Sequence, residues 1–151
     1  MRKLPAVEEA KSLMAVATDW GVWKWLTEKR RVRAAADAAW AELGEAEKKV
    51  KSAWPDELKQ AYDELAAASG KRRTKRREPA APAEAKAAAQ RVQAADEAAY
   101  RAHMDAEDIF AESEKRLSTS LAREGAARAI EAWELTEKAI RLAEAAGRAS
   151  R

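Results

Sequence analysis

Four side chains that bind metals or exchange protons fall on one face of a predicted helix. They are Asp96, Tyr100, His103 and Glu107, separated by three or four residues. Di-iron sites in helical bundles take carboxylates from several helices and a Glu-x-x-His pair from two of them. Here a tyrosine stands three residues before the single histidine. We therefore predict no metal and no other cofactor, and only an interchain site on a dimer axis would change this interpretation.

The sequence carries no recognisable catalytic motif. Ser118, Thr119 and Ser120 have no candidate base nearby, and no Gly-x-Ser-x-Gly turn occurs. The five glycines stand alone, so no glycine-rich phosphate loop is predicted, and the lack of cysteine excludes a thiol nucleophile or a disulfide. We expect a protein that is not an enzyme and that has no small-molecule substrate.

A run of basic residues in the middle of the chain is a candidate binding segment. Residues 70–78 carry six cations and one acid, whereas residues 1–69 are neutral and residues 79–151 carry a net charge of −2. Such a run can neutralise phosphates and bind nucleic acid without sequence preference, although it lacks stacking aromatics. The other interpretation is a solvated connector, or one that pairs with the acidic residues of 105–114. The candidate polyanion-binding residues are Lys71, Arg72, Arg73, Lys75, Arg76 and Arg77.

Tryptophans near the start of the chain form a second candidate surface. Trp20, Trp23 and Trp25 point in almost all directions around a helix, so one buried face cannot accommodate all of them. Tryptophan is also enriched in binding hot spots. We predict a partner or self-association surface that consists of Trp20, Trp23, Trp25, Leu26 and Trp133. Two alternatives stay open: a locally thick core that includes Trp133, and a helix at a membrane surface.

The composition favours long helices that pack through small side chains. Of 151 residues, 40 are alanine and 36% are charged, while glycine and proline number only five and four. The N-terminus becomes acidic where a secretory signal would need an apolar core. The apolar-leaning stretch 13–26 is shorter than the roughly 20 residues that span a bilayer. We expect a cytoplasmic protein for which a membrane surface is not the favoured partner.

The spacing of apolar residues predicts two helical arms. Apolar residues recur in steps of three and four from 22 to 53 and from 88 to 113, and a broader apolar face follows over 117–142. Pro55 ends or kinks the first long helix, and a shorter helix follows it. The predicted parts are an N-terminal arm (1–69) with a further helix start at Thr18-Asp19, a basic Pro-containing linker (70–82), and a C-terminal arm (83–151) that can bend at 118–120 or Gly125.

The predicted fold is all-α, an elongated antiparallel helical hairpin or three-helix bundle with Ala-rich, coiled-coil-like seams. If the chain turns near residue 76, residue i faces about residue 152 − i. This rule pairs Leu43 with Ile109, Val22 with Ile130, and Trp20 with Ala132 and Trp133. Alanine seams let helices approach closely but bury little area. The hairpin therefore needs more packing, which we expect from both a folded-back helix 55–69 and a second chain.

These features predict a structural or adaptor protein without enzymatic activity. It would act through self-association, as a homo-oligomer, and through binding to a helical protein partner. The alternative is a non-specific nucleic-acid-binding protein that uses the basic residues of 71–77.

Overall fold

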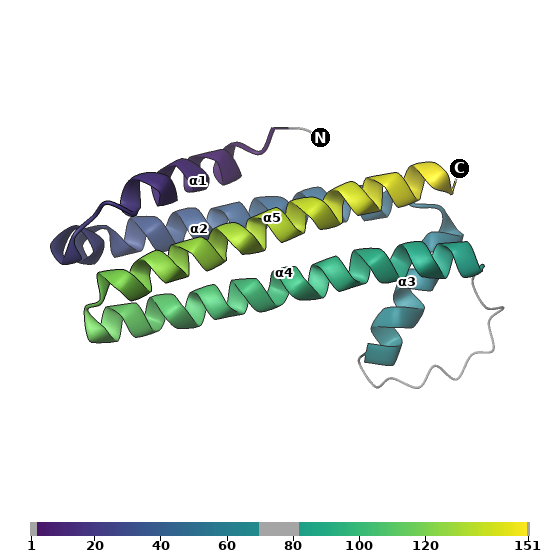
Figure 1. The fold of residues 1–151 in the computed structure, drawn as a ribbon. Helices are drawn as coiled ribbons and strands as arrows, with labels where there is room; N and C mark the ends of the chain where they lie inside the picture. The colour runs from purple at the N-terminus through teal and green to yellow at the C-terminus, as the bar shows by residue number, and fades with distance from the viewer. Residues whose placement is uncertain (1–2, 70–81, 151) are drawn as a thin grey trace.

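The computed structural model describes residues 3–69 and 82–150, in which all regular secondary structure is helical. The described helices are α1 (Pro5–Ala17), α2 (Val22–Ser52), α3 (Asp56–Ser69), α4 (Ala83–Arg116) and α5 (Thr119–Ala149). The long helices α2, α4 and α5 lie side by side, α1 covers α2 and α5, and α3 crosses the start of α4 (Figure 1). The all-α prediction is confirmed. None of the helices in these residues is long and apolar enough to cross a membrane.

The predicted C-terminal arm consists of two helices that reverse direction at Leu117. Leu117 adopts the left-handed conformation (φ 51°, ψ 45°), and the N–H of Ser118 donates to the carbonyl of Ser113 over 3.1 Å. The Ser118 hydroxyl accepts a hydrogen bond of 3.2 Å from the N–H of Leu121 and so caps α5. The break thus falls at the Ser-Thr-Ser segment, one of the two bend positions that the sequence indicated.

Gly125, the other predicted bend position, lies inside α5 and serves helix packing instead. A Cβ atom at this position would lie 3.0 Å from Cδ1 of Phe110 on α4, which is closer than most real Cβ contacts. The α5 residues buried around it are also small: Ala122, Ala126, Ala129 and Ala132. Small side chains therefore let α4 and α5 approach closely along their length.

Helices α2 and α4 run antiparallel, but their register differs from the predicted one. Arg33 Nε lies 2.8 Å from Glu114 Oε1, and Lys51 Nζ lies 2.8 Å from Asp96 Oδ2. Both ion pairs are shifted by five residues from the 152 − i rule. The predicted pairing of Leu43 with Ile109 is offset accordingly.

Helix α5 runs parallel to α2, so the pairs predicted between them are wrong. At one end of α2, Val22 lines a pocket together with Thr119, the first residue of α5. At the other end, Trp54 donates its Nε1–H to the carbonyl of Ala143 over 2.8 Å. Val22 therefore lies far from Ile130, and Trp20 lies far from Ala132 and Trp133. The reversal at Leu117, which a single long arm lacks, causes this correction.

Helix α3 packs on α4 and not back along α2. Its buried residues Leu58 and Ala61 share a core cluster with Ala85, Ala89 and Val92 of α4. The extra packing that the alanine seams require comes from α5 and α1 instead. The prediction that helix 55–69 folds back along the first arm is therefore wrong.

Helix α1 is held at its first turn by a side chain of α2. The N–H groups of Ala6 and Val7 each donate to the Glu42 carboxylate over 3.1 Å, where Leu4 offers no side-chain cap. Lys11 Nζ lies 2.6 Å from Glu137 Oε1 and joins α1 to α5. Helix α1 ends at Ala17 and α2 begins at Val22, close to the new helix start that the sequence indicated at Thr18-Asp19.

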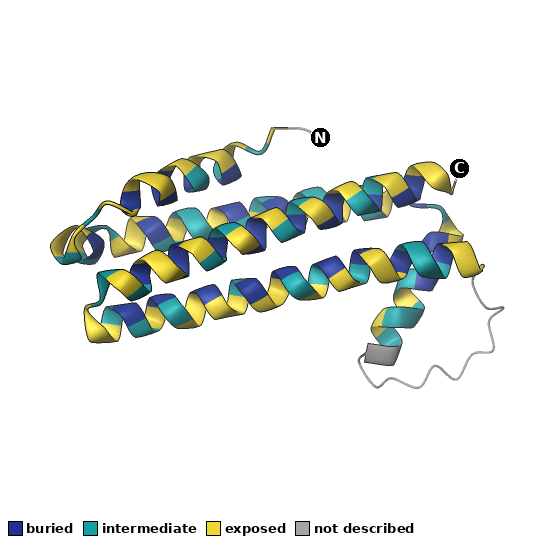
Figure 2. Ribbon diagram, in the orientation of Figure 1, coloured by how far each residue is buried: buried dark blue, intermediate teal, exposed yellow. Residues whose placement is uncertain are grey.

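Burial follows one face of each long helix (Figure 2). The largest core cluster joins α1, α2, α4 and α5 around side chains such as Met14, Leu43, Trp133 and Ile140, which are at most 1% exposed. Alanine fills most of the buried positions of α4. The core is thus long and thin, with few large side chains.

We predict that two Gly→Ala substitutions change stability in opposite directions. Gly125→Ala pushes a methyl group against the Phe110 ring and lowers the free energy of unfolding by about 1–3 kcal/mol. Gly44→Ala, where a Cβ meets no atom within 4 Å, raises it by up to about 1 kcal/mol because alanine favours helix. Urea denaturation followed by circular dichroism measures both, and a stabilised Gly125→Ala variant contradicts the packing argument.

Candidate functional site

Large apolar side chains are exposed at one end of the molecule, which we call the tryptophan end. Here the α1–α2 connection, the first turns of α2 and the α4–α5 turn lie together (Figure 1). Trp23 is 81% exposed, Val16 60% and Leu117 54%. Exposed groups of this size at one end of a helical body are typical of an interaction surface.

The structure divides the predicted tryptophan surface into exposed and buried members. Trp23 is exposed, and Trp20 and Leu26 are half-buried. Trp25 is buried and meets Trp20 edge-to-face, with 5.3 Å between ring centroids. Trp133 is buried farther along α5, beside Ala129 and Ala36. The accessible part of the predicted surface is therefore Trp20, Trp23 and Leu26.

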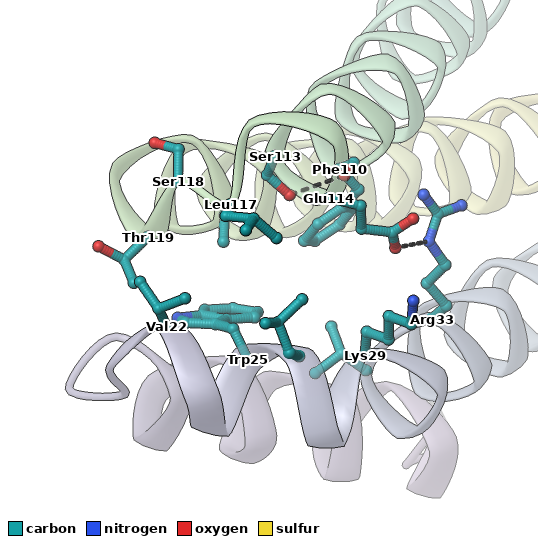
Figure 3. A pocket seen from close by; sticks show the side chains of 13 residues that line it. Val22, Trp25, Lys29, Arg33, Phe110, Ser113, Glu114, Leu117, Ser118 and Thr119 are labelled. Atoms are coloured by element: carbon teal, nitrogen blue, oxygen red, sulfur yellow. Dashed lines mark hydrogen bonds and ion pairs between the residues drawn. The ribbon is translucent and has the colours of Figure 1, made fainter.

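A small pocket of about 30 Å³ lies at this end between α2 and the α4–α5 turn. Val22 and Trp25 face Phe110 and Leu117 across it (Figure 3), and Leu26 also lines it. The Trp25 Nε1–H is buried and is the one buried side-chain polar group of the described residues that has no hydrogen-bond partner. The pocket has room for one small group, and an acceptor there would satisfy the indole.

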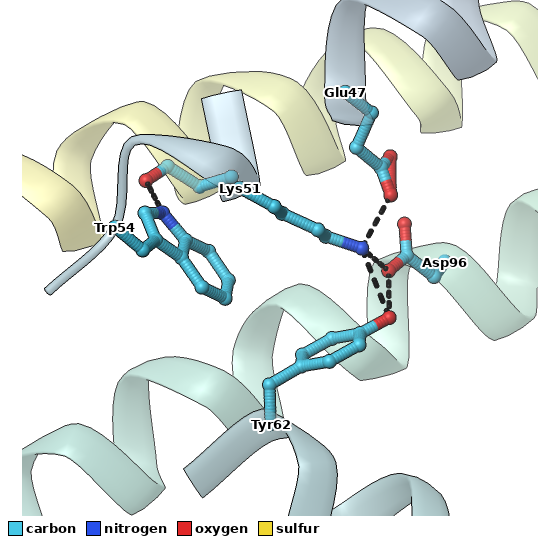
Figure 4. Close-up of polar contacts among 6 residues, drawn as sticks. Glu47, Lys51, Trp54, Tyr62 and Asp96 are labelled. Carbon is cyan, nitrogen blue, oxygen red and sulfur yellow. Dashed lines mark hydrogen bonds and ion pairs between the residues drawn. The ribbon is translucent and has the colours of Figure 1, made fainter. Parts of the chain in front are cut away.

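A second candidate site is a polar cluster of Glu47 and Lys51 on α2, Tyr62 on α3 and Asp96 on α4. Lys51 Nζ donates to Glu47 Oε1 (2.7 Å), Asp96 Oδ2 (2.8 Å) and the Tyr62 hydroxyl (2.9 Å), as Figure 4 shows. The Tyr62 hydroxyl donates to Asp96 Oδ2 over 2.7 Å. Lys51 Nζ also lies 4.1 Å from the centroid of the Tyr62 ring. Three helices are therefore joined at one ammonium group.

The pKa values of the two carboxyl groups in this cluster are shifted in opposite directions. Burial, and next a hydrogen bond with Asp96, raise the pKa of Glu47 to about 7. Burial alone would also raise the pKa of Asp96, but hydrogen bonds from Glu47, Lys51 and Tyr62 outweigh it and lower that pKa. A hydrogen bond between two carboxyl groups needs a proton on one of them, and these shifts place it on Glu47.

The cluster lies at an open pocket of about 320 Å³ between α2, α3 and α4. Its walls include Trp40, Tyr62 and Tyr100, and Gly44 and Thr136 line it as well. Aromatic rings and charged groups thus meet in one concave surface, the kind of place where ligands bind. Glu47, Lys51 and Tyr62 were not predicted from the sequence, because their contacts join residues that are as far as 45 positions apart.

The structure separates the polar residues that the sequence placed on one face of α4. Asp96 belongs to the polar cluster, and Tyr100 is 58% exposed at its pocket. His103 stacks on Trp40 with 4.1 Å between ring centroids, and its Nε2 lies 3.3 Å from Glu107. Among residues 3–69 and 82–150, no three His, Asp or Glu side chains gather so that they could hold a metal ion.

The candidate polyanion-binding residues of 71–77 lie outside the described residues. A comparison of the chain with protein-family models, with curated proteins and with solved structures finds no match. The class of the protein therefore rests on its own structure, which is all-α.

We predict that Glu47→Gln stabilises the protein at alkaline pH. The folded state holds the Glu47 proton up to about pH 7, whereas the unfolded chain releases it near 4.5. The stability that this proton provides is fully present below pH 4.5 and is lost as the pH rises through 7. Glutamine stays neutral, so the variant should exceed the wild type by about 1–3 kcal/mol at pH 8 but not at pH 4.5.

Chemical denaturation at several pH values measures this difference. The matched control is Glu45→Gln, which removes an exposed carboxylate from the same helix but lies outside the polar cluster. A pH-independent difference for Glu47→Gln would contradict the assigned protonation of the cluster.

Proposed function

We propose that this protein is a structural or adaptor protein without enzymatic activity, which acts in the cytoplasm through self-association and helix-mediated partner binding. The observation that supports this proposal is the 81% exposure of Trp23 at the tryptophan end. Tryptophan is the residue type most enriched in binding hot spots, and it loses the most apolar exposure when a partner covers it.

The backbone at Leu117 gives a second reason to assign binding to this end. A left-handed conformation costs a residue with a Cβ about 1–2 kcal/mol, and glycine usually fills the position after a helix. Leu117 is nevertheless 54% exposed, so the burial of its side chain within the chain offsets only part of this conformational free energy. A partner that covers Leu117 would provide the missing apolar contact.

Charge indicates which surface of a second copy fits the tryptophan end. Lys29 and Arg30 are exposed one to two turns after Trp23, so two tryptophan ends would repel each other. On α4, Met104 is 39% exposed and is followed by exposed Glu107 and Asp108. We propose that the tryptophan end of one copy binds this acidic surface of the next copy.

Such a head-to-side contact joins two different surfaces, so a pair of copies keeps one free tryptophan end and one free acidic surface. Contacts of this type generate rings or open chains. In this proposal α2, α4 and α5 act as one three-helix bundle with coiled-coil-like alanine seams, which holds the two surfaces at a fixed separation. A partner protein with an acidic amphipathic helix would use the same tryptophan end.

The alternative function, non-specific nucleic-acid binding, depends on residues 71–77 alone. Replacement of their six cations by glutamine should abolish retention of DNA or RNA if that function holds. Under our proposal the same variant keeps its self-association unchanged. The two functions are thereby separated in one protein preparation.

We predict that Trp23→Ala and Met104→Lys each abolish self-association, because the first removes the central apolar contact and the second sets a lysine against the cations Lys29 and Arg30 of the next copy. Light scattering over a concentration series should show oligomers for the wild type and monomers for either variant. A mixture of the two variants should form dimers and nothing larger, since it restores one intact contact only.

The control is Ala145→Lys, which adds the same charge at an exposed position near the end of α5, away from both surfaces. It should associate like the wild type. A wild-type chain that stays monomeric at all concentrations would overturn self-association, and a mixture that forms long oligomers would overturn the head-to-side arrangement.

A further inference from the structure

The pocket beside the polar cluster contains a glycine that helix packing does not require. Gly44 lies in the interior of α2, where glycine costs about 1 kcal/mol relative to alanine. A Cβ built there meets no atom within 4 Å, in contrast to Gly125 and Gly147, which press against Phe110 and Trp54. Gly44 lines the 320 Å³ pocket, so the effect of its missing side chain is to keep this pocket open.

The charged groups that face this pocket balance only while Glu47 keeps its proton. From α2 it receives Glu47 and Lys51, and from α4 Asp96, so the described residues that line it supply two carboxyl groups and one cation. The polar side chains from the other elements are the phenols of Tyr62 and Tyr100 and the Thr136 hydroxyl, which donates to the carbonyl of Ala132. Lys48 lines only the neighbouring hollow at Gly44 and Ser52. While Glu47 keeps its proton, Lys51 and Asp96 neutralise each other; once Glu47 loses it, the pocket carries one negative charge that no lining cation balances.

The walls of the pocket suit a cation that carries an aliphatic stem. Trp40, Tyr62 and Tyr100 bring aromatic rings to it from three helices. Aromatic faces attract ammonium groups and also pack well against methylene chains. A volume of about 320 Å³ accommodates a small organic group and greatly exceeds one water molecule.

We propose that this pocket binds an organic ammonium ion, whose charge pairs with Glu47 and whose aliphatic stem packs between Trp40 and Tyr100 over Gly44. Two sources share this chemistry: a free aliphatic amine and the lysine side chain of another protein. The pKa of Glu47 is raised to about 7 without a ligand, so a bound cation that lowers this pKa releases a fraction of a proton at neutral pH.

Calorimetric titration of the full chain at pH 7 tests this inference. The probes are 1,5-diaminopentane, which represents a free amine, and a lysine blocked at both backbone ends, which represents a side chain. The tighter of the two identifies the source, and binding of either supports the proposal. Absence of binding by both amines, or binding of acetate in their place, overturns it.

Gly44→Leu blocks the pocket without an expected loss of stability, because a Cβ at Gly44 has free space and leucine favours helix. Its circular dichroism and melting temperature should match or exceed those of the wild type, while amine affinity falls about tenfold or more. Unchanged affinity in a folded Gly44→Leu protein overturns the proposed location. If leucine disturbs the fold, Gly44→Ala provides the same test with a smaller side chain.

Two further variants test the charge pairing. Glu47→Gln should weaken amine binding about tenfold and remove the proton release, which appears as a dependence of the binding heat on the ionisation heat of the buffer. Glu45→Gln removes a carboxylate one residue from Gly44 but outside the pocket, and should change neither. Equal effects of the two variants would show attraction by overall charge only and would overturn the site.

Discussion

Close contact between helices through small side chains is the constraint on which this structure depends. Alanine and glycine line the α4–α5 interface, and Phe110 lies directly over Gly125. Each such contact removes little apolar area from water, and burial stabilises the fold by only about 25 cal/mol per Å². A seam of this kind becomes stable only when it is long or when further helices cover its flanks. The length of α2, α4 and α5 and the cover provided by α1 both follow from this requirement.

A two-residue turn decides the topology. Leu117 and Ser118 reverse the chain, so α5 returns along α4 and runs parallel to α2. The sequence predicted the helical periods of both regions and named the Ser-Thr-Ser segment as a weak point. It did not predict the reversal, because leucine at the left-handed position carries none of the usual signals of glycine or asparagine. The pairs predicted between α2 and α5 failed for this reason, whereas the pairing of Leu43 with Ile109 failed because the register between α2 and α4 is shifted by five residues.

The candidate sites show the same division between what periodicity predicts and what it cannot. Exposure of part of the tryptophan cluster follows from helix geometry, since Trp20, Trp23 and Trp25 point in different directions. The polar cluster was not predicted, because Lys51, Tyr62 and Asp96 meet only after three helices have taken their places. Likewise Trp133 was assigned to the surface, although α5 carries it into the core. The local sequence pattern thus predicts which face of a helix a residue lies on, whereas contacts between residues of different helices depend on the turns between those helices.

Glycine illustrates why the pocket could be recognised only in three dimensions. In sequence, Gly44, Gly125 and Gly147 are equivalent: each interrupts a helical pattern that is rich in alanine. In the structure, Gly125 admits Phe110 and Gly147 admits the Trp54 ring, whose Cδ1 lies 3.2 Å from a Cβ built there.

The contact at Gly147 involves a ring that packs against a wall of the pocket at Gly44. Trp54, fixed by its hydrogen bond to Ala143, lies at the start of α3 and meets Tyr62 edge-to-face at 5.8 Å. The packing of α5 against Trp54 thus continues through this aromatic pair to Tyr62, whose hydroxyl bonds to Lys51 and Asp96. The chemistry of the polar cluster therefore depends on a glycine that is distant from it in sequence and that touches none of its charged groups.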